Sequence, residues 1–220
     1  MVYKGILDGG AMVATKVLNL TQRGASRSFI SECRTLGTIR HRNLVKILSV
    51  RSSVDFRGND FKALIYEFMA NESLERWLHP RTIGQDDECS KSRNLRLVQR
   101  LNIAIDIATA IEYLHKDCYP AIVHGDLKPS NVLLDIDKVA RVGDFGLAKI
   151  ISTMSIETTR VPDQEYGMGH KVSTLGDAYS YGILLLEMFF ERDPLKRPLG
   201  TILTFTTLSE WLFRIKQWTS

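Results

Sequence analysis

The chain has 220 residues, of which 44% are hydrophobic and 25% charged, as in an ordinary globular protein with a sizeable core. Its net charge of +4 is small and its basic residues are scattered, which argues against nucleic acid as a partner. Cys33, Cys89 and Cys118 follow neither disulfide nor metal-ligand spacing, which is typical of a reducing compartment. Because no signal peptide and no transmembrane segment is visible, we expect a cytoplasmic protein.

The first part of the chain predicts a small sheet with one helix packed on it. Residues 2–18 contain two short strand patterns around a turn at Asp8, Gly9 and Gly10. Apolar residues at helical spacing then predict a helix over residues 26–39. Two more strand patterns follow at residues 44–50 and 61–69, separated by a polar turn.

Beyond residue 71 the patterns favour helices, so the expected fold class is α+β. Residues 79–94 are polar and rich in turn formers, which indicates a surface insertion. Residues 97–115 predict a helix, and residues 132–142 a hairpin that turns at residues 135–138. The apolar stripe of that helix is predicted to be Leu101, Ala104, Ile105, Ala108 and Ile111. Residues 176–190 are apolar nearly all round, as in a helix buried at the centre of a domain.

One loop, VHGDLKPSNVLLD at residues 123–135, gathers an acid, a cation and an amide. Asp126 can act as a base where a hydroxyl proton must leave, and Lys128 can neutralise charge on a transferred phosphoryl group. Asn131 offers a side-chain oxygen to a hard cation such as Mg²⁺. The same residue types are equally typical of a polar turn, in which Asp and Asn hydrogen-bond to their own backbone. The loop alone leaves both interpretations open.

A second motif, GDFGLAK at residues 143–149, places Asp144 after the predicted hairpin. The loop H-x-D-L-K-x-x-N, the hairpin and this Asp-Phe-Gly together resemble the eukaryotic protein kinase family. The resemblance implies a two-lobed fold, with a small β-rich N-lobe that carries one helix and a mainly α-helical C-lobe. It also implies ATP and Mg²⁺ as cofactors, Asp126 as the catalytic base with Lys128 beside it, and Asn131 and Asp144 as metal ligands.

Upstream residues match the same family in order. Lys16, in VATK, corresponds to the lysine that contacts the ATP phosphates, and Glu32 to its ion-pair partner on the next helix. Taken alone, a strand lysine and a helix glutamate are usually solvated surface groups. The resemblance further implies that backbone groups of Glu67 and Met69 hold adenine. The apolar walls of the adenine site would be Val2, Ala14 and Leu133.

The expected domain organisation follows from these matches. Residues 1–66 would form the N-lobe without most of its glycine-rich loop, 67–71 the hinge, and 72–190 the C-lobe with the insertion at 79–94. Residues 191–220 read as a divergent tail, so we expect a kinase domain truncated at both ends. Asp177 resembles the buried aspartate that steadies the catalytic loop, although a helix N-cap is an equally good interpretation locally.

The loop DLKPSN resembles that of serine/threonine kinases. The runs HRNLVKILSV, YEFMANESLERWLH and DAYSYGILLLEM are similar to plant receptor-like kinases with leucine-rich repeats. This likeness implies protein substrates with serine or threonine, partner receptor-like kinases, and a place at the cytosolic face of the plasma membrane in a full-length receptor. Gly125 stands where most kinases have an arginine that binds an activation-loop phosphate. A glycine at this position resembles the arginine-lacking receptor-like kinases of innate immune perception. We expect it to affect regulation and not the chemical step, because the catalytic base Asp126 is unchanged.

Two departures from the family pattern keep other functions open. Asp163 and Gln164 replace the usual Ala-Pro before Glu165, and the resemblance stops after Phe190. One alternative is a kinase-like interaction module with weak or no catalysis. The other is a truncated gene product.

Overall fold

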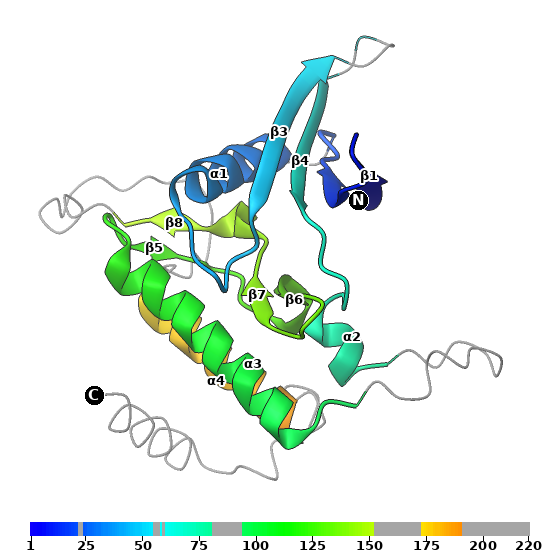
Figure 1. The fold of residues 1–220 in the computed structure, drawn as a ribbon. Helices are drawn as coiled ribbons and strands as arrows, with labels where there is room; N and C mark the ends of the chain where they lie inside the picture. Colours follow the sequence, from blue (N-terminus) through cyan, green and yellow to red (C-terminus); the bar gives the residue numbers. More distant parts are fainter. Residues whose placement is uncertain (22–23, 55–57, 59, 81–93, 152–172, 191–220) are drawn as a thin grey trace, which may run out of the picture.

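The computed structural model describes residues 1–21, 24–54, 58, 60–80, 94–151 and 173–190. A β-sheet with one helix stands above a part built mainly of helices and short hairpins (Figure 1). The α+β fold class is therefore confirmed. The substituted segment around Glu165, most of the predicted insertion and the predicted tail lie outside the described residues.

The upper sheet is four-stranded and antiparallel, with the order β1-β2-β4-β3. Its strands are β1 (Val2–Ile6), β2 (Met12–Val17), β3 (Ile47–Val54) and β4 (Asp60–Glu67). The predicted turn joins β1 to β2, and the Gly10 N–H donates to the Leu7 carbonyl across it. The third predicted strand begins later than expected, since residues 44–46 continue an extended loop in which Leu44 bridges to Val142.

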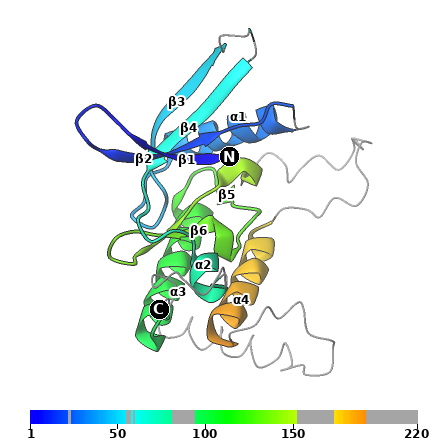
Figure 2. The ribbon, with the colours of Figure 1, turned by 90° about the vertical axis from the view of Figure 1, so that its right-hand side faces the viewer.

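Helix α1 (Ala25–Thr38) packs beside this sheet, as expected, and Figure 2 shows it behind β4. Phe29 and Leu36 are buried on its inner face, whereas Ile30 is exposed. The helix ends where Ile39 turns extended, and the Arg40 guanidinium donates to the Leu36 and Ile39 carbonyls. A cation on the last carbonyls satisfies groups that would otherwise lack a partner and favours the negative end of the helix dipole.

The lower part contains α2 (Leu74–Leu78), α3 (Leu97–Glu112) with its wider last turn η2 (Tyr113–Asp117), and α4 (Thr174–Phe190). Helices α3 and α4 lie side by side in both views (Figures 1 and 2). The Tyr181 hydroxyl of α4 donates to the Ala104 carbonyl of α3 at 2.9 Å. The helix predicted to be buried all round is buried only in part, because Tyr179 is exposed and Leu186 is half-buried while Leu184, Leu185 and Met188 are buried.

The predicted stripe on α3 is wrong in part. Ala104 and Ile111 are buried as expected, but Leu101 and Ile105 are exposed, and Ile103 and Ile107 are buried in their place. Helix α3 carries apolar residues on most of its sides, so periodicity cannot choose the inner face. The choice is made by α4 and the hairpin strand β7, against which α3 packs.

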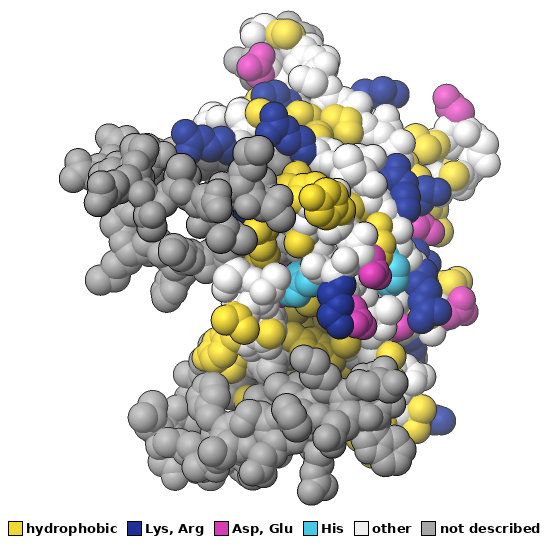
Figure 3. All heavy atoms as spheres, turned by 90° about the vertical axis from the view of Figure 1, so that its left-hand side faces the viewer, with side chains coloured by type: hydrophobic (Ala, Val, Ile, Leu, Met, Phe, Trp, Pro, Cys, Tyr) yellow, Lys and Arg dark blue, Asp and Glu magenta, His cyan; other side chains and the backbone are white. Residues whose placement is uncertain are grey.

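Two short antiparallel strand pairs, of which one is a hairpin, hold the loops of interest between these layers. Strand β5 (Ile122–Val123) pairs with β8 (Lys149–Ile150), and β6 (Val132–Leu134) pairs with β7 (Ala140–Val142), as the hairpin pattern predicted. The 3-10 turns η3 (Pro129–Asn131) and η4 (Phe145–Leu147) lie next to them. On the face shown in Figure 3, basic, acidic and hydrophobic side chains are interspersed.

The partition of α3 can be tested with a matched pair of isoleucines. We expect Ile107→Ala to lower the free energy of unfolding by about 2–5 kcal/mol, because Ile107 is fully buried and its truncation leaves a cavity. Ile105→Ala, at a side chain that is 61% exposed, should change it by less than about 1 kcal/mol. Urea denaturation followed by circular dichroism measures both, and similar losses would contradict the assigned face.

Candidate active site

A cluster of three charged side chains joins the sheet, α1 and the start of η4. The Lys16 ammonium on β2 lies 2.9 Å from Glu32 Oε2 on α1 and 2.7 Å from Asp144 Oδ1. Burial would lower the pKa of Lys16, but the two carboxylates outweigh it and hold the pKa above its ordinary value. Burial would likewise raise the pKa of Asp144, and Lys16 holds it below the ordinary value. Both partners are therefore charged at neutral pH.

Tyr66, on β4, contacts this cluster and was not predicted as a site residue. Its hydroxyl donates to Glu32 Oε1 at 2.5 Å, and Glu32 is fully buried. Burial, with the negative charge of Glu32, raises the pKa of Tyr66, so the hydroxyl keeps its proton and remains a donor. No local pattern in the sequence points to this pair, because Tyr66 lies at the end of a buried strand where an aromatic residue is ordinary core.

The backbone that carries Asp144 is fixed by close packing against α1. Gly146 approaches the Ser28 side chain so closely that a Cβ atom there would clash, and the Ser31 hydroxyl donates to the Ala148 carbonyl at 2.7 Å. Asp144 itself has a left-handed backbone with φ of 62°. A residue other than glycine is held there only where its surroundings over-determine the conformation. The fully buried Phe145 ring, edge-on to His124, supplies part of that constraint.

The side chains of the loop over residues 123–135 converge as their spacing predicted. Lys128 Nζ lies 2.8 Å from Asp126 Oδ2, and Asn131 Nδ2 donates to the same oxygen at 3.0 Å. Asn131 Nδ2 also donates to the Asp126 carbonyl at 2.7 Å, which closes the loop on itself. The side-chain oxygen of Asn131 is left as the atom that can bind a cation. Asp126 and Lys128 are partly exposed, so a substrate can reach them.

Asp177 fixes the backbone of that loop from the first turn of α4. Its carboxylate accepts hydrogen bonds from the N–H groups of His124 at 2.8 Å and Gly125 at 2.9 Å, and His115 Nε2 lies 2.9 Å away. Burial acts to raise the pKa of Asp177, but these donors outweigh it and hold the pKa below its ordinary value. Of the two interpretations of Asp177, the structure favours the loop-steadying one.

Buried His124 links the two motifs. Its Nε2 lies 3.0 Å from the Gly143 carbonyl and its Nδ1 accepts from the Asp126 N–H at 3.2 Å, so the ring is the neutral tautomer with its proton on Nε2. Burial lowers the pKa of His124, in agreement with a neutral ring. The loop that carries Asp126 is thus tied directly to the residue before Asp144.

Comparison with known proteins agrees with this geometry, since the family model described as the protein kinase domain matches residues 1–218. The chain belongs to the protein kinase family. Members of this family use ATP with a divalent metal ion and act on proteins. The match continues past residue 190, so the expectation that the resemblance stops after Phe190 is wrong.

Receptor-like kinases of plants are among the similar proteins. The LRR receptor-like serine/threonine-protein kinase EFR of Arabidopsis thaliana is 47% identical over 88% of this chain, and the receptor kinase-like protein Xa21 of Oryza sativa subsp. japonica is 49% identical over 88%. Another LRR receptor-like serine/threonine-protein kinase of A. thaliana is 48% identical over 95% of the chain. The chain spans 19% to 22% of the length of these relatives.

Within the kinase fold, Gly125 adopts a left-handed backbone with φ of 77°, a conformation that glycine reaches without strain. Its N–H is one of the two that Asp177 holds. The absence of an arginine side chain therefore removes a phosphate-binding group but leaves the backbone geometry next to Asp126 intact.

The residues expected around adenine lie on β1, β2 and β6 and at the end of β4. Glu67 ends β4, and Met69 follows it as a buried residue whose N–H donates to no other group in the described part of the chain. Ala14 and Leu133 are half-buried on β2 and β6, whereas Val2 on β1 is largely exposed. Within the described residues, the Met69 N–H is thus a backbone donor without a partner.

The buried carboxylate of Asp177 generates a prediction about pH. Because its folded-state pKa is depressed, its contribution to stability is complete above the unfolded pKa near 3.8 and is lost as pH falls through the folded value. Asp177→Asn should lower the free energy of unfolding by about 3 kcal/mol at pH 7, and this difference from wild type should shrink below about pH 4. Urea denaturation across this range tests it, and a difference that stays constant with pH would contradict the assignment.

The contribution of Tyr66 can be separated from that of an ordinary buried tyrosine. Tyr66→Phe removes a donor to a buried carboxylate and should cost about 1.5–3 kcal/mol. Tyr181→Phe removes a bond to a neutral carbonyl and should cost about 0.5–1.5 kcal/mol. Chemical denaturation of both variants gives the comparison. An equal or larger loss in Tyr181→Phe would argue against a charged Glu32 acceptor.

Proposed function

We propose that the chain transfers the γ-phosphate of ATP to serine or threonine hydroxyls of protein substrates. The observation that carries this proposal is the pairing of two clusters. Lys16, Glu32 and Asp144 form one, and Asp126, Lys128 and Asn131 form the other, with His124 between them. A simple polar turn would require neither the ion pairs of Lys16 nor the hydrogen bonds of His124 that link the two clusters.

Nucleotide positioning is assigned to the first cluster and the strand ends beside it. Lys16, held by Glu32, would contact the α- and β-phosphates, with its charge preserved by its two carboxylate neighbours. Backbone groups of Glu67 and Met69 would receive adenine, and the Met69 N–H, which has no partner among the described residues, supports that role. The apolar walls of this site are proposed to be Val2, Ala14 and Leu133.

A Mg²⁺ ion fits the oxygen donors that the two motifs provide. Asn131 offers an amide oxygen and Asp144 a carboxylate, of which one oxygen is engaged by Lys16. In the described residues no three acidic, His or Cys side chains gather into a preformed cage, which suits a metal held by few protein ligands and by substrate phosphates. When bound, the metal neutralises charge on the phosphates.

The chemical step is assigned to the second cluster. The substrate hydroxyl would give its proton to an Asp126 carboxylate oxygen as its own oxygen bonds to the γ-phosphorus and the bond to the ADP oxygen breaks. Lys128, 2.8 Å from Asp126, stabilises charge on the moving phosphoryl group. Asn131 holds the Asp126 carboxylate in place through its amide nitrogen.

The receptor-like relatives suggest where such a domain works. By analogy with proteins named receptor-like kinases, we propose that it acts at the cytosolic face of the plasma membrane within a longer receptor and engages partner receptor-like kinases. Within the described residues, no helix is long and apolar enough to cross a membrane. The lobes are proposed at residues 1–66 and 72–190, with the hinge at 67–71.

Two variants separate nucleotide binding from chemistry. Mg²⁺-ATP at about a hundred times its dissociation constant should stabilise the wild type by roughly 2.7 kcal/mol and raise the thermal midpoint by several degrees. Asp144→Asn should lose this rise. Asp126→Asn should keep it while phosphorylation of a generic protein substrate with radiolabelled ATP falls by about 10²–10⁴-fold.

The same experiment distinguishes the alternative function. A cooperative unfolding transition that does not respond to Mg²⁺-ATP would indicate a non-catalytic interaction module. Loss of the thermal shift in Asp126→Asn as well as in Asp144→Asn would contradict the division of roles between the two clusters.

A further inference from the structure

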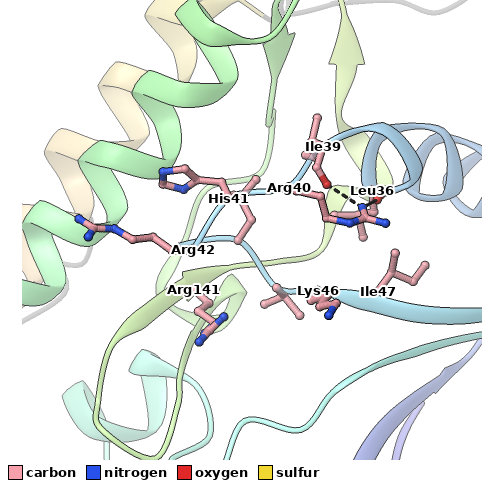
Figure 4. A pocket seen from close by; sticks show the side chains of 10 residues that line it. Leu36, Ile39, Arg40, His41, Arg42, Lys46, Ile47 and Arg141 are labelled. Carbon is pink, nitrogen blue, oxygen red and sulfur yellow. Dashed lines mark hydrogen bonds between the residues drawn. The ribbon is translucent and has the colours of Figure 1, made fainter.

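A cavity of about 340 Å³ opens where the end of α1, the start of β3 and strand β7 meet (Figure 4). None of its lining residues belongs to the proposed nucleotide or catalytic groups. Four of them are basic, namely Arg40, Arg42, Lys46 and Arg141, and none is acidic. We call this cavity the α1–β3 pocket.

Most of the positive charge around the α1–β3 pocket is not balanced. Arg141 is paired with Asp135 at 3.1 Å and lies 3.7 Å from Glu67, so its charge is compensated. In contrast, no carboxylate in the described part of the chain pairs with the other three basic side chains, Arg40, Arg42 and Lys46. Three uncompensated cations around one cavity favour an anionic ligand.

Arg40 is already oriented for such a ligand. One guanidinium nitrogen, Nη1, donates to the Leu36 carbonyl at 2.6 Å and to the Ile39 carbonyl at 2.7 Å, which fixes the plane of the group. Its other side-chain N–H groups make no hydrogen bond with the described residues, so they are available to an oxyanion. Figure 4 shows the Arg42 side chain extending away from Lys46, so Arg40 and Lys46 are the two cations of interest.

Apart from the four basic residues and His41, the lining of the α1–β3 pocket is apolar. The side chains of Leu36, Leu44 and Val45 are buried along it, Ile39 closes the end of α1, and Ile47 is half-buried on β3. A bare inorganic anion would leave this surface unused. A ligand that carries an aliphatic group beside its negative charge would satisfy both parts of the lining.

We propose that the α1–β3 pocket binds a phosphorylated peptide segment of a partner protein, with its phosphate against Arg40 and Lys46 and a neighbouring aliphatic side chain against Leu36 and Ile47. A phosphoserine or phosphothreonine carries nearly two negative charges and three acceptor oxygens, which match a fixed guanidinium and a mobile ammonium. Nucleic acid is a poorer match, because its binding uses extended basic surfaces with aromatic groups free to stack on bases. This lining is one small cavity, and its aromatic side chain, His41, is already stacked on Tyr113.

The position of the α1–β3 pocket gives such binding a consequence. Leu36 lies one helical turn after Glu32 on α1, and Arg141 lies on β7, the strand that leads to Asp144. A bound peptide would therefore contact both α1 and β7, the elements that position the ion pairs of Lys16. This consequence rests on the proposed kinase function, whereas binding itself does not.

The test uses the full chain and an array of short peptides with a central phosphoserine. The neighbouring positions are set to Leu, Ile, Val, Gly, Asp or Lys, and each peptide has an unphosphorylated counterpart. Phosphorylated peptides with aliphatic neighbours should bind at least about tenfold tighter than their counterparts, the effect of one charge-assisted hydrogen bond. Fluorescence anisotropy with the best peptide of the array then gives its dissociation constant.

A matched pair of charge reversals locates the site. Lys46→Glu should weaken this peptide by about tenfold or more, whereas Arg51→Glu, at an exposed residue of β3 that does not line the cavity, should leave it unchanged. Both variants should keep the thermal midpoint of the wild type, because both side chains are exposed. Because binding is read directly, failure here is distinct from failure of phosphotransfer.

Three outcomes would overturn the proposal. The first is equal binding of phosphorylated and unphosphorylated peptides. The second is an equal loss in Lys46→Glu and Arg51→Glu, which would indicate a diffuse charge effect. The third is displacement of the peptide by inorganic phosphate or by phosphatidylserine vesicles at concentrations no higher than those of the unlabelled peptide, because the apolar lining would then contribute nothing.

Discussion

The contact between Lys16, Glu32 and Asp144 is the interaction on which the arrangement of the site depends. It ties the sheet to α1 and both to the turn at η4, three segments that are far apart in the chain. A buried carboxylate such as Glu32 is costly unless it is paired and hydrogen-bonded. Here Lys16 and Tyr66 both bind the Glu32 carboxylate, so removal of either partner leaves this buried negative charge less well compensated. The pairing is thus a constraint on where α1 can lie.

A second constraint fixes the backbone of the loop over residues 123–135, and it comes from residues that do not face a substrate. Asp177 and His124 are buried and hydrogen-bonded to backbone groups, and Asp177 also contacts His115, so both hold the loop without facing a substrate. The groups that would face a substrate, Asp126 and Lys128, remain partly exposed on the same loop. This division explains how a short loop can be both rigid and accessible, because the hydrogen bonds that order its backbone come from the buried side chains of Asp177 and His124.

The α1–β3 pocket lies at the C-terminal end of α1, the helix that carries Glu32. Arg40 caps the final carbonyls of α1 while its remaining donors lie beside an apolar lining. Helix α1 therefore carries a negative side chain toward the proposed nucleotide site and a positive one at its C-terminus, each placed by a bond to a different part of the molecule. A helix held at its middle and at its C-terminal end can relay a change between these two points as a small rigid shift.

The sequence by itself determined the local elements and the motif residues. The turns, the strands of the sheet and the hairpin after Asn131 follow from turn chemistry and alternation, which act between near neighbours. The spacing of Asp126, Lys128 and Asn131 placed them in one loop, because residues so close along the chain cannot separate far. Only the tertiary structure decided that Ile107 rather than Ile105 is buried on α3, that Tyr66 meets Glu32, and that Arg40 and Lys46 share a cavity. Those outcomes depend on contacts between distant segments, for which neither periodicity nor spacing in a single sequence carries a signal.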